Sequence, residues 1–353
     1  MFDLNSLIRP HIRNIAPYSS ARDEYSGTEG VFLDANENPF GSTTGEAFNR
    51  YPDPYQHALK TRIAEIKGVR AEQIFLGNGS DEAIDLLYRA FCVPEQDEAV
   101  LLPPTYGMYQ VSADINGIMT RRVELTEDYQ LDPESVKKVI SGQSKLIFIC
   151  SPNNPTGNLL DPEAIEQVLR IFPGLVVIDE AYIDFADHPG FATRLDEFPN
   201  LVVLQTFSKA WGMANLRLGM AFASVEIIKV LNKIKPPYNV SGLTQERVLA
   251  ALQFVEAKER MVQSILVERT RMMEVLHSLP QVKHVYPSDA NFLLARVDDP
   301  DGFYDFLINR RVIVRNRSKV VLCDGCLRIT IGSSEENNQL LHAMSEYALP
   351  QTS

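Results

Sequence analysis

Short apolar runs that alternate with helical patterns are the feature that most restricts how this chain can fold. Strands covered on both faces by helices read as nearly continuous apolar stretches, so the pattern predicts an α/β fold with a mostly parallel central sheet flanked by helices. The predicted strands cover residues 74–76, 99–102, 146–150, 175–178, 201–205 and 219–223. Helices are predicted over 81–92 and 162–171, and one long helix over 243–279.

After this long helix the pattern changes and predicts a smaller α+β lobe. Its expected strands and helices are 291–297, 312–315 and 327–331, and 302–310 and 334–347. We therefore expect an N-terminal segment (1–38) that packs on the small domain, a large domain (39–240) and a small C-terminal domain (241–353). The stretch 233–242 contains two prolines and marks the junction.

Composition narrows the range of functions. The chain has 353 residues and a formal net charge of -12, which argues against nucleic acid or an anionic membrane as a partner, because either would need a basic face. No apolar run approaches the roughly 18 residues of a membrane span. Four cysteines are too few for a disulfide framework in a chain of this length, so we expect a reduced, cytoplasmic protein. Cys323 and Cys326 have a metal-type spacing but lack a second ligand pair, and no metal is expected.

Polar groups gather where the predicted strands end. In "LGNGSDEAIDLL", Gly77 and Gly79 allow close backbone approach, and Ser80 is a favourable N-cap for a helix that begins near Asp81. The free N–H groups of a helix start form an anion site, although a plain capped turn explains the same residues. Glu82 stands where a dinucleotide fingerprint would have its third glycine, so that motif is not present.

Two further strand ends carry unusual side chains. In "CSPNNPTGN" the adjacent Asn153 and Asn154 would place amide donors in the crevice, or they form an ordinary turn. In "VVIDEAYIDF" four apolar residues lead into Asp179, with Tyr182 three positions on. A carboxylate at the end of a buried strand is costly unless it meets a cation, with a metal ligand or a helix cap as the alternatives.

The stretch "LQTFSKAWGMANLRLG" places Lys209 between hydroxyls directly after a strand, with Arg217 eight positions later. The carboxyl ends of strands in an open α/β sheet line one ligand crevice, so Asp179, Lys209 and Arg217 should meet there. An amine, a carboxylate, ring-oxygen donors and an anion site are the four groups that pyridoxal phosphate requires. Their joint presence in this order points to that cofactor.

These residues also carry a family resemblance. The chain resembles the pyridoxal-phosphate aminotransferases with the aspartate aminotransferase fold (fold type I) over essentially its whole length. The matching segments are "LDANENPFG", "RYPDP", "GNGSDE", "PPTYGMY", "SPNNPTG", "DEAYIDF", "TFSKAWGMANLRLG" and "GCLRITIG". "LDANENP", "YPDP" and "LRITIG" are similar to a narrower group that transfers an amino group between histidinol phosphate and 2-oxoglutarate, giving glutamate. Asn215 departs from the "LAGLR" of many relatives but keeps the lysine-to-arginine spacing.

The resemblance implies a role for each residue. Lys209 would bind the cofactor covalently and move the substrate proton, Asp179 would hold the ring nitrogen, and Tyr182 would contact the ring oxygen. Tyr106 would stack on the ring, and Tyr51 would reach the cofactor phosphate from the other subunit, which implies a homodimer. The full set of expected cofactor-binding residues is Ser80, Asp81, Tyr106, Asn154, Asp179, Tyr182, Thr206, Ser208, Lys209, Arg217 and Tyr51.

Two dissimilar anionic substrates would share this site, and arginine suits both because its planar fork donates two parallel hydrogen bonds. The resemblance indicates Arg328 and Arg315 as receptors, with Tyr18 and Asn36 as further substrate-binding residues. A solvated charge at a strand edge is the alternative for Arg315. An aromatic amino acid aminotransferase, a phosphorylated-amino-acid decarboxylase on the same scaffold and a non-catalytic binding module remain alternative functions.

Overall fold

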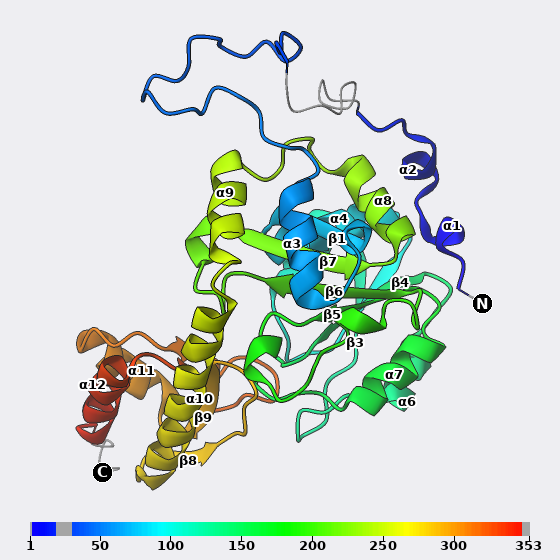
Figure 1. The fold of residues 1–353 in the computed structure, drawn as a ribbon. Coiled ribbons are helices and arrows are strands. Elements are labelled where there is room, and N and C mark those ends of the chain that lie inside the picture. Colours follow the sequence, from blue (N-terminus) through cyan, green and yellow to red (C-terminus); the bar gives the residue numbers. More distant parts are fainter. Residues whose placement is uncertain (1, 19–29, 348–353) are drawn as a thin grey trace.

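The computed structural model describes residues 2–18 and 30–347. Within them, a seven-stranded sheet forms the large lobe and a four-stranded sheet the small lobe, lower left in Figure 1. The strands of the large sheet are β1 (Ile74–Asn78), β2 (Glu98–Leu101), β3 (Met119–Arg122), β4 (Ser144–Cys150), β5 (Leu175–Asp179), β6 (Leu201–Thr206) and β7 (Leu218–Ala223). Those of the small sheet are β8 (Val282–Val285), β9 (Phe292–Val297), β10 (Arg315–Asn316) and β11 (Cys326–Thr330).

Helices cover both faces of the large sheet and one side of the small one. Those of the large lobe are α3 (His57–Lys67), α4 (Gly79–Phe91), α5 (Met108–Ile115), α6 (Pro133–Val139), α7 (Pro162–Ile171), α8 (Val225–Ile234) and α9 (Gly242–Ala251). The short α1 (Leu4–Leu7) and α2 (Pro10–Asn14) precede them, and α10 (Val255–Ser278), α11 (Pro300–Asn309) and α12 (Ser334–Ser345) belong to the small lobe. None of the described helices is long and apolar enough to cross a membrane.

The order of the large sheet is β1-β7-β6-β5-β4-β2-β3, and its centre is parallel from β3 to β6. β7 is antiparallel to both β6 and β1. The predicted mostly parallel sheet is therefore confirmed. This topology brings the carboxyl ends of β1, β4, β5 and β6 and the start of β7 to one edge of the sheet.

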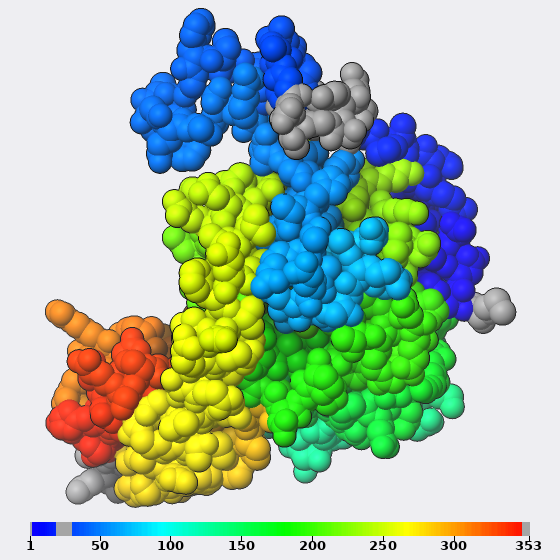
Figure 2. Space-filling model, viewed as in Figure 1, coloured from blue at the N-terminus to red at the C-terminus, as the bar shows by residue number. Residues whose placement is uncertain are grey.

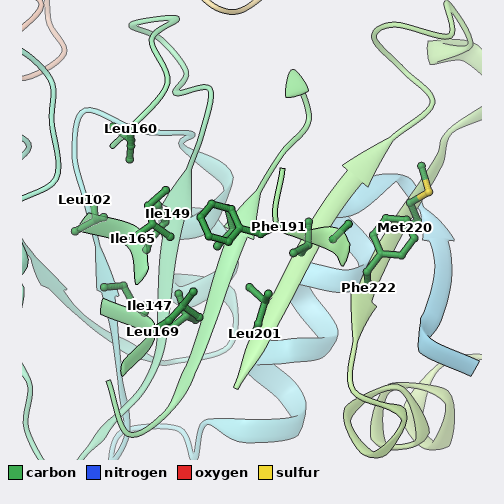
Figure 3. Packing of buried hydrophobic residues seen from close by; sticks show 14 of the residues in the cluster. Leu102, Ile147, Ile149, Leu160, Ile165, Leu169, Phe191, Leu201, Met220 and Phe222 are labelled. Atoms are coloured by element: carbon green, nitrogen blue, oxygen red, sulfur yellow. The ribbon is translucent and has the colours of Figure 1, made fainter. Parts of the chain in front are cut away.

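Alternate residues of the central strands supply two separate cores. Val176 and Ile178 of β5 face one helical layer, whereas Leu175 and Val177 face the other. Figure 3 shows part of the first cluster, in which Ile149, Ile165 and Phe222 lie among other apolar side chains. Burial on both faces explains why these strands read as continuous apolar runs. The edge strand β3 was not predicted because Met119–Arg122 is polar and largely exposed.

Three predictions about the elements and their packing differ from the structure. The helix expected over 243–279 is broken into α9 and α10 at residues 252–254, where Leu252 packs in the large-lobe core. The strand expected over 312–315 is reduced to Arg315–Asn316, since the chain first closes α11 through the bond from Val312 N to Leu307 O (2.9 Å).

The third difference concerns the N-terminal segment. Leu7 and Ile8 pack in the core on the α4 and α8 side of the large sheet, so the expectation that 1–38 packs on the small domain is wrong for α1. Arg9 anchors this part through a bond from its backbone N–H to Ala90 O (3.0 Å). The other expected domain boundaries stay predictions.

Candidate active site

A cavity of about 110 Å³ lies at the edge of the large sheet where the strands end. Every predicted cofactor residue except Tyr51 lines it, although they come from five separate segments of the chain. The lining residues are Gly79, Ser80, Asp81, Tyr106, Cys150, Asn154, Asp179, Ala181, Tyr182, Thr206, Ser208, Lys209 and Arg217. The structure thus brings together the amine, the carboxylate, the amide and the hydroxyls that the sequence singled out.

Asp179 is one of the residues that line this cavity. It is the last residue of β5, is almost fully buried, and accepts hydrogen bonds from Tyr109 Oη (2.7 Å) and the Ala181 backbone N–H (3.0 Å). Burial raises the pKa of the carboxyl, and the two hydrogen bonds oppose this shift only in part. A positively charged group at this carboxylate would relieve the remaining desolvation.

Lys209 also lines the cavity, from the loop after β6. Its Nζ is 5.4 Å from the centroid of the Tyr182 ring. Burial and the nearby guanidinium of Arg328 lower the pKa of the amine, which increases its neutral, reactive fraction. An amine that is partly desolvated beside a buried carboxylate is suited to covalent or general-base chemistry.

The start of α4 also lines the cavity, and the free N–H groups and dipole of a helix start favour an anion. Ser80 lies in the first turn, not at the N-cap as predicted; Asn78 takes that position. Gly79 has a φ of +72°, and a Cβ there would lie 2.9 Å from Arg217 Nη2, so the backbone approach needs glycine. Gly79 N donates to Arg217 O (2.7 Å), which fixes the arginine beside the helix start. The hydroxyls of Thr206 and Ser208, 3.0 Å apart, complete this end.

Tyr109 is a site residue that the sequence reasoning missed. It is fully buried, bonds Asp179 directly, and stacks on Phe148 with centroids 4.8 Å apart. Its ring also meets that of Tyr106 edge-on at 5.5 Å. Tyr109 lies three positions after Tyr106 in "PPTYGMY", a spacing that could have identified it as a neighbour.

Arg328 of the small lobe contacts a residue of the cavity lining without lining the cavity itself. It lies on β11, hydrogen-bonds the side-chain oxygen of Asn154 and stands 5.2 Å from the Phe292 ring centroid. Arg315 lies directly across from it on the edge strand β10 and is exposed. The two predicted arginines are therefore neighbours.

Besides the two arginines, three further predicted residues do not line the cavity in the single chain. Tyr18 is 72% exposed, Asn36 is exposed with a φ of +54°, and Tyr51 stacks on Tyr238 at 4.5 Å. The latter two belong to residues 30–51, which project beyond the body of the molecule in Figures 1 and 2. None of the three lines the cavity.

A sequence model of the family described as "Aminotransferase class I and II" matches residues 28–344. The chain belongs to this family. Pyridoxal phosphate is the family's cofactor, and the fold with its mostly parallel sheet agrees with the fold type I of such transferases. The donor set of the cavity fits this cofactor: a lysine amine, a buried carboxylate for a cationic ring nitrogen, and a glycine-walled anion site.

Similar proteins carry a more specific name. The chain is 56% identical to the histidinol-phosphate aminotransferase of Cytophaga hutchinsonii, over 98% of this chain and 99% of that protein. It is 54% identical to that of Parabacteroides distasonis, over 99% and 100%. Among solved structures, histidinol-phosphate aminotransferase from Clostridium acetobutylicum superposes with a TM-score of 0.78 at 25% identity, covering 84% of this chain and 90% of that one.

The cysteines do not form a metal site in the part of the chain that the structure describes. All four are free and buried, and no cluster of three or more potential ligands occurs there. Burial raises the pKa of the Cys323 thiol to about 12. The C-x-x-C pair is thus an apolar packing element between the lobes.

Proposed function

We propose that this chain is a histidinol-phosphate aminotransferase, which transfers an amino group between L-histidinol phosphate and 2-oxoglutarate to give imidazole acetol phosphate and L-glutamate. The observation that carries the proposal is the identity above 50%, over nearly the full length, to proteins of that name. The cavity supports it, because the required chemical groups line one site. The activity would serve histidine biosynthesis.

The chain's own residues would hold the cofactor. The Asp179 carboxylate would meet the ring nitrogen, Tyr182 and Asn154 would contact the ring oxygen, and Tyr106 would stack on the ring. The phosphate would lie at the start of α4, against Ser80, Asp81 N–H, Thr206, Ser208 and Arg217, where backbone N–H groups and the helix dipole favour an anion.

When bound, pyridoxal phosphate supplies an electron-withdrawing ring that makes the substrate Cα proton acidic. Lys209 would remove this proton as general base and deliver one as general acid, and burial lowers the pKa of its amine, which favours the role of base. Asp179 would stay ionised against the cationic ring nitrogen. Tyr109 would hold the aspartate in place through its 2.7 Å hydrogen bond.

Arg328 would bind the anionic end of both substrates, and its bond to Asn154 would orient its guanidinium toward the cavity. Arg315 and Tyr18 would serve the phosphate of histidinol phosphate, and Asn36 would contact the substrate. For Tyr18 and Asn36 this requires a rearrangement or a second subunit, since both are exposed in the single chain.

We also propose a homodimer. The projecting residues 30–51 expose apolar side chains of Val31, Leu33, Phe40, Phe48 and Tyr51, and Phe40 is 95% exposed. A second copy would cover this apolar surface and receive Tyr51 at its cofactor phosphate. We propose the cytoplasm as its location, an expectation that the four free, buried cysteines support.

Assay of the purified protein tests the function. It should be yellow, and borohydride should abolish the absorption band and fix the label to Lys209. Histidinol phosphate with 2-oxoglutarate should give glutamate faster than phenylalanine does. Faster turnover of phenylalanine would indicate an aromatic aminotransferase, loss of carbon dioxide a decarboxylase, and colourless protein that takes up no pyridoxal phosphate would contradict the whole proposal.

Subunit mixing tests the shared site. An inactive Lys209→Ala subunit and an inactive Tyr51→Ala subunit should yield hybrids with one intact site, so activity should return on exchange. A monomer by light scattering would refute the dimer while leaving the reaction assay unaffected.

A further inference from the structure

A third guanidinium, that of Arg317, stands beside the two predicted substrate arginines. Arg315 of β10 pairs directly with Arg328 of β11, and Arg317 continues this ladder because its backbone N–H donates to Cys326 O (2.9 Å). Successive side chains of a strand point to opposite faces, so Arg315 and Arg317 share the face that carries Arg328. Three cationic side chains therefore crowd one face of a two-stranded edge.

This arrangement is unfavourable without an anion. Like charges placed directly opposite on neighbouring strands destabilise the pair. Burial and then the guanidinium of Arg315 lower the pKa of Arg317; burial lowers that of Arg328, with Arg317 and Arg315 acting in the same direction. Within the described residues, no carboxylate forms an ion pair with any of the three. Asp301, which lies beside Arg315 and Arg317, accepts instead from Asn316 Nδ2 (2.6 Å).

Arg317 also has an unused donor. Its Nε is buried and has no hydrogen-bond partner among the described residues. Tyr182, which lines the cavity, is close enough to Arg317 to raise the pKa of the Arg317 guanidinium, against the larger effect of burial. A hollow of about 470 Å³ beside Arg315 and Arg317 leaves this edge open to a ligand. The cluster thus extends from Arg328, which contacts the cavity-lining Asn154, to the hollow lined by Arg315 and Arg317.

We propose that Arg317 determines substrate specificity: with Arg315 and Arg328 it forms a three-guanidinium receptor that selects a phosphate monoester over a carboxylate. A phosphate monoester carries close to two negative charges at pH 7 and three acceptor oxygens, whereas a carboxylate carries one charge and two oxygens. Two arginines are sufficient for a carboxylate, so the third gains an interaction only with the phosphate. That the phosphate monoester is histidinol phosphate rests on the proposed function. The three-arginine receptor itself is inferred from the pairing of β10 with β11.

Binding of inorganic phosphate tests the receptor without turnover. The probe is titrated by calorimetry into holoenzyme whose cofactor has been fixed to Lys209 with borohydride, so that only the substrate end is open. Arg317→Gln should bind phosphate about tenfold or more weakly, because a charge-assisted hydrogen bond is lost. Arg260→Gln removes the same charge from an exposed position on α10 and should bind like the wild type.

Single-turnover kinetics supply the second measurement. Arg317→Gln should lower the specificity constant for histidinol phosphate about tenfold or more and that for glutamate less than about threefold. Arg317→Lys keeps the positive charge and the aliphatic part of the side chain but loses the planar guanidinium. Its specificity constant for histidinol phosphate should therefore lie between those of the wild type and Arg317→Gln. This variant also keeps the test valid if Arg317→Gln does not fold.

Equal losses for both substrates, or phosphate binding that is unchanged in Arg317→Gln, would overturn the proposal. If wild-type protein does not use histidinol phosphate but Arg317→Gln still weakens phosphate binding, the proposed function fails and the receptor stands.

Discussion

Replacing Glu180 with glutamine should flatten the pH dependence of stability. Glu180 follows Asp179 but does not line the cavity; it is 2% exposed. Its carboxylate accepts from Gln205 Nε2 (2.9 Å) and Phe191 N (2.5 Å). Gln205 Oε1 is buried with no partner among the described residues. If the Gln205 amide flips, this oxygen can accept a hydrogen bond from protonated Glu180 or from a glutamine at position 180. Glu180→Gln therefore preserves the packing and removes only the charge.

The structure sets the size and sign of the effect. Burial raises the pKa of Glu180 from its ordinary 4.5 to about 7, against the two hydrogen bonds. When the pKa of a carboxyl is higher in the folded than in the unfolded protein, the group stabilises the folded protein fully at pH values below the unfolded-state pKa. This stability is lost as the pH rises through the folded-state pKa. At about 1.4 kcal/mol per pK unit this is about 3 kcal/mol in total, of which about 2 kcal/mol is lost between pH 5.5 and 8.5.

The assay is urea unfolding of wild type and Glu180→Gln, both saturated with pyridoxal phosphate, at intervals from pH 5.5 to 8.5. The difference in free energy of unfolding between the two proteins should shift by about 2 kcal/mol across this range in favour of the variant. Asp179 is present in both proteins, so its contribution largely cancels. Glu134→Gln, at an exposed helix position, is the matched control and should run parallel to the wild type. Parallel curves for Glu180→Gln as well would refute the reasoning.

Four further predictions concern the site. Lys209→Ala should lose turnover almost completely while the circular dichroism spectrum stays native, because no other lining group can carry the Cα proton. Asp179→Asn should bind cofactor more weakly and lose several powers of ten in kcat, each equal to about 1.4 kcal/mol of barrier; near-normal kcat would mean that the ring nitrogen has another partner. Tyr109→Phe leaves Asp179 without its 2.7 Å donor and should weaken cofactor binding about tenfold in equilibrium dialysis. Arg328→Lys should raise KM for histidinol phosphate and glutamate alike, and a loss confined to one substrate would exclude a shared receptor.

Local patterns were sufficient for the central strands and the site residues on them. Strands β4, β5 and β6 are buried on both faces, so their apolar runs were unambiguous, and the polar residues after each run had to lie at one edge of a parallel sheet. The break between α9 and α10 could not be predicted. No glycine or proline lies between Ala251 and Val255, and the break falls where Leu252 packs in the large-lobe core, a contact that the helical pattern does not reveal.

The sequence by itself determined the sheet class and the chemistry available at the strand ends, because both depend on residue type and short-range periodicity. Only the tertiary structure decided which side chains touch. Tyr109 reaches Asp179 across seventy residues, and Arg317 joins Arg315 and Arg328 through the pairing of β10 with β11. Such contacts depend on strand order and register, which hydrophobic patterns constrain for the core but not for polar side chains at an edge.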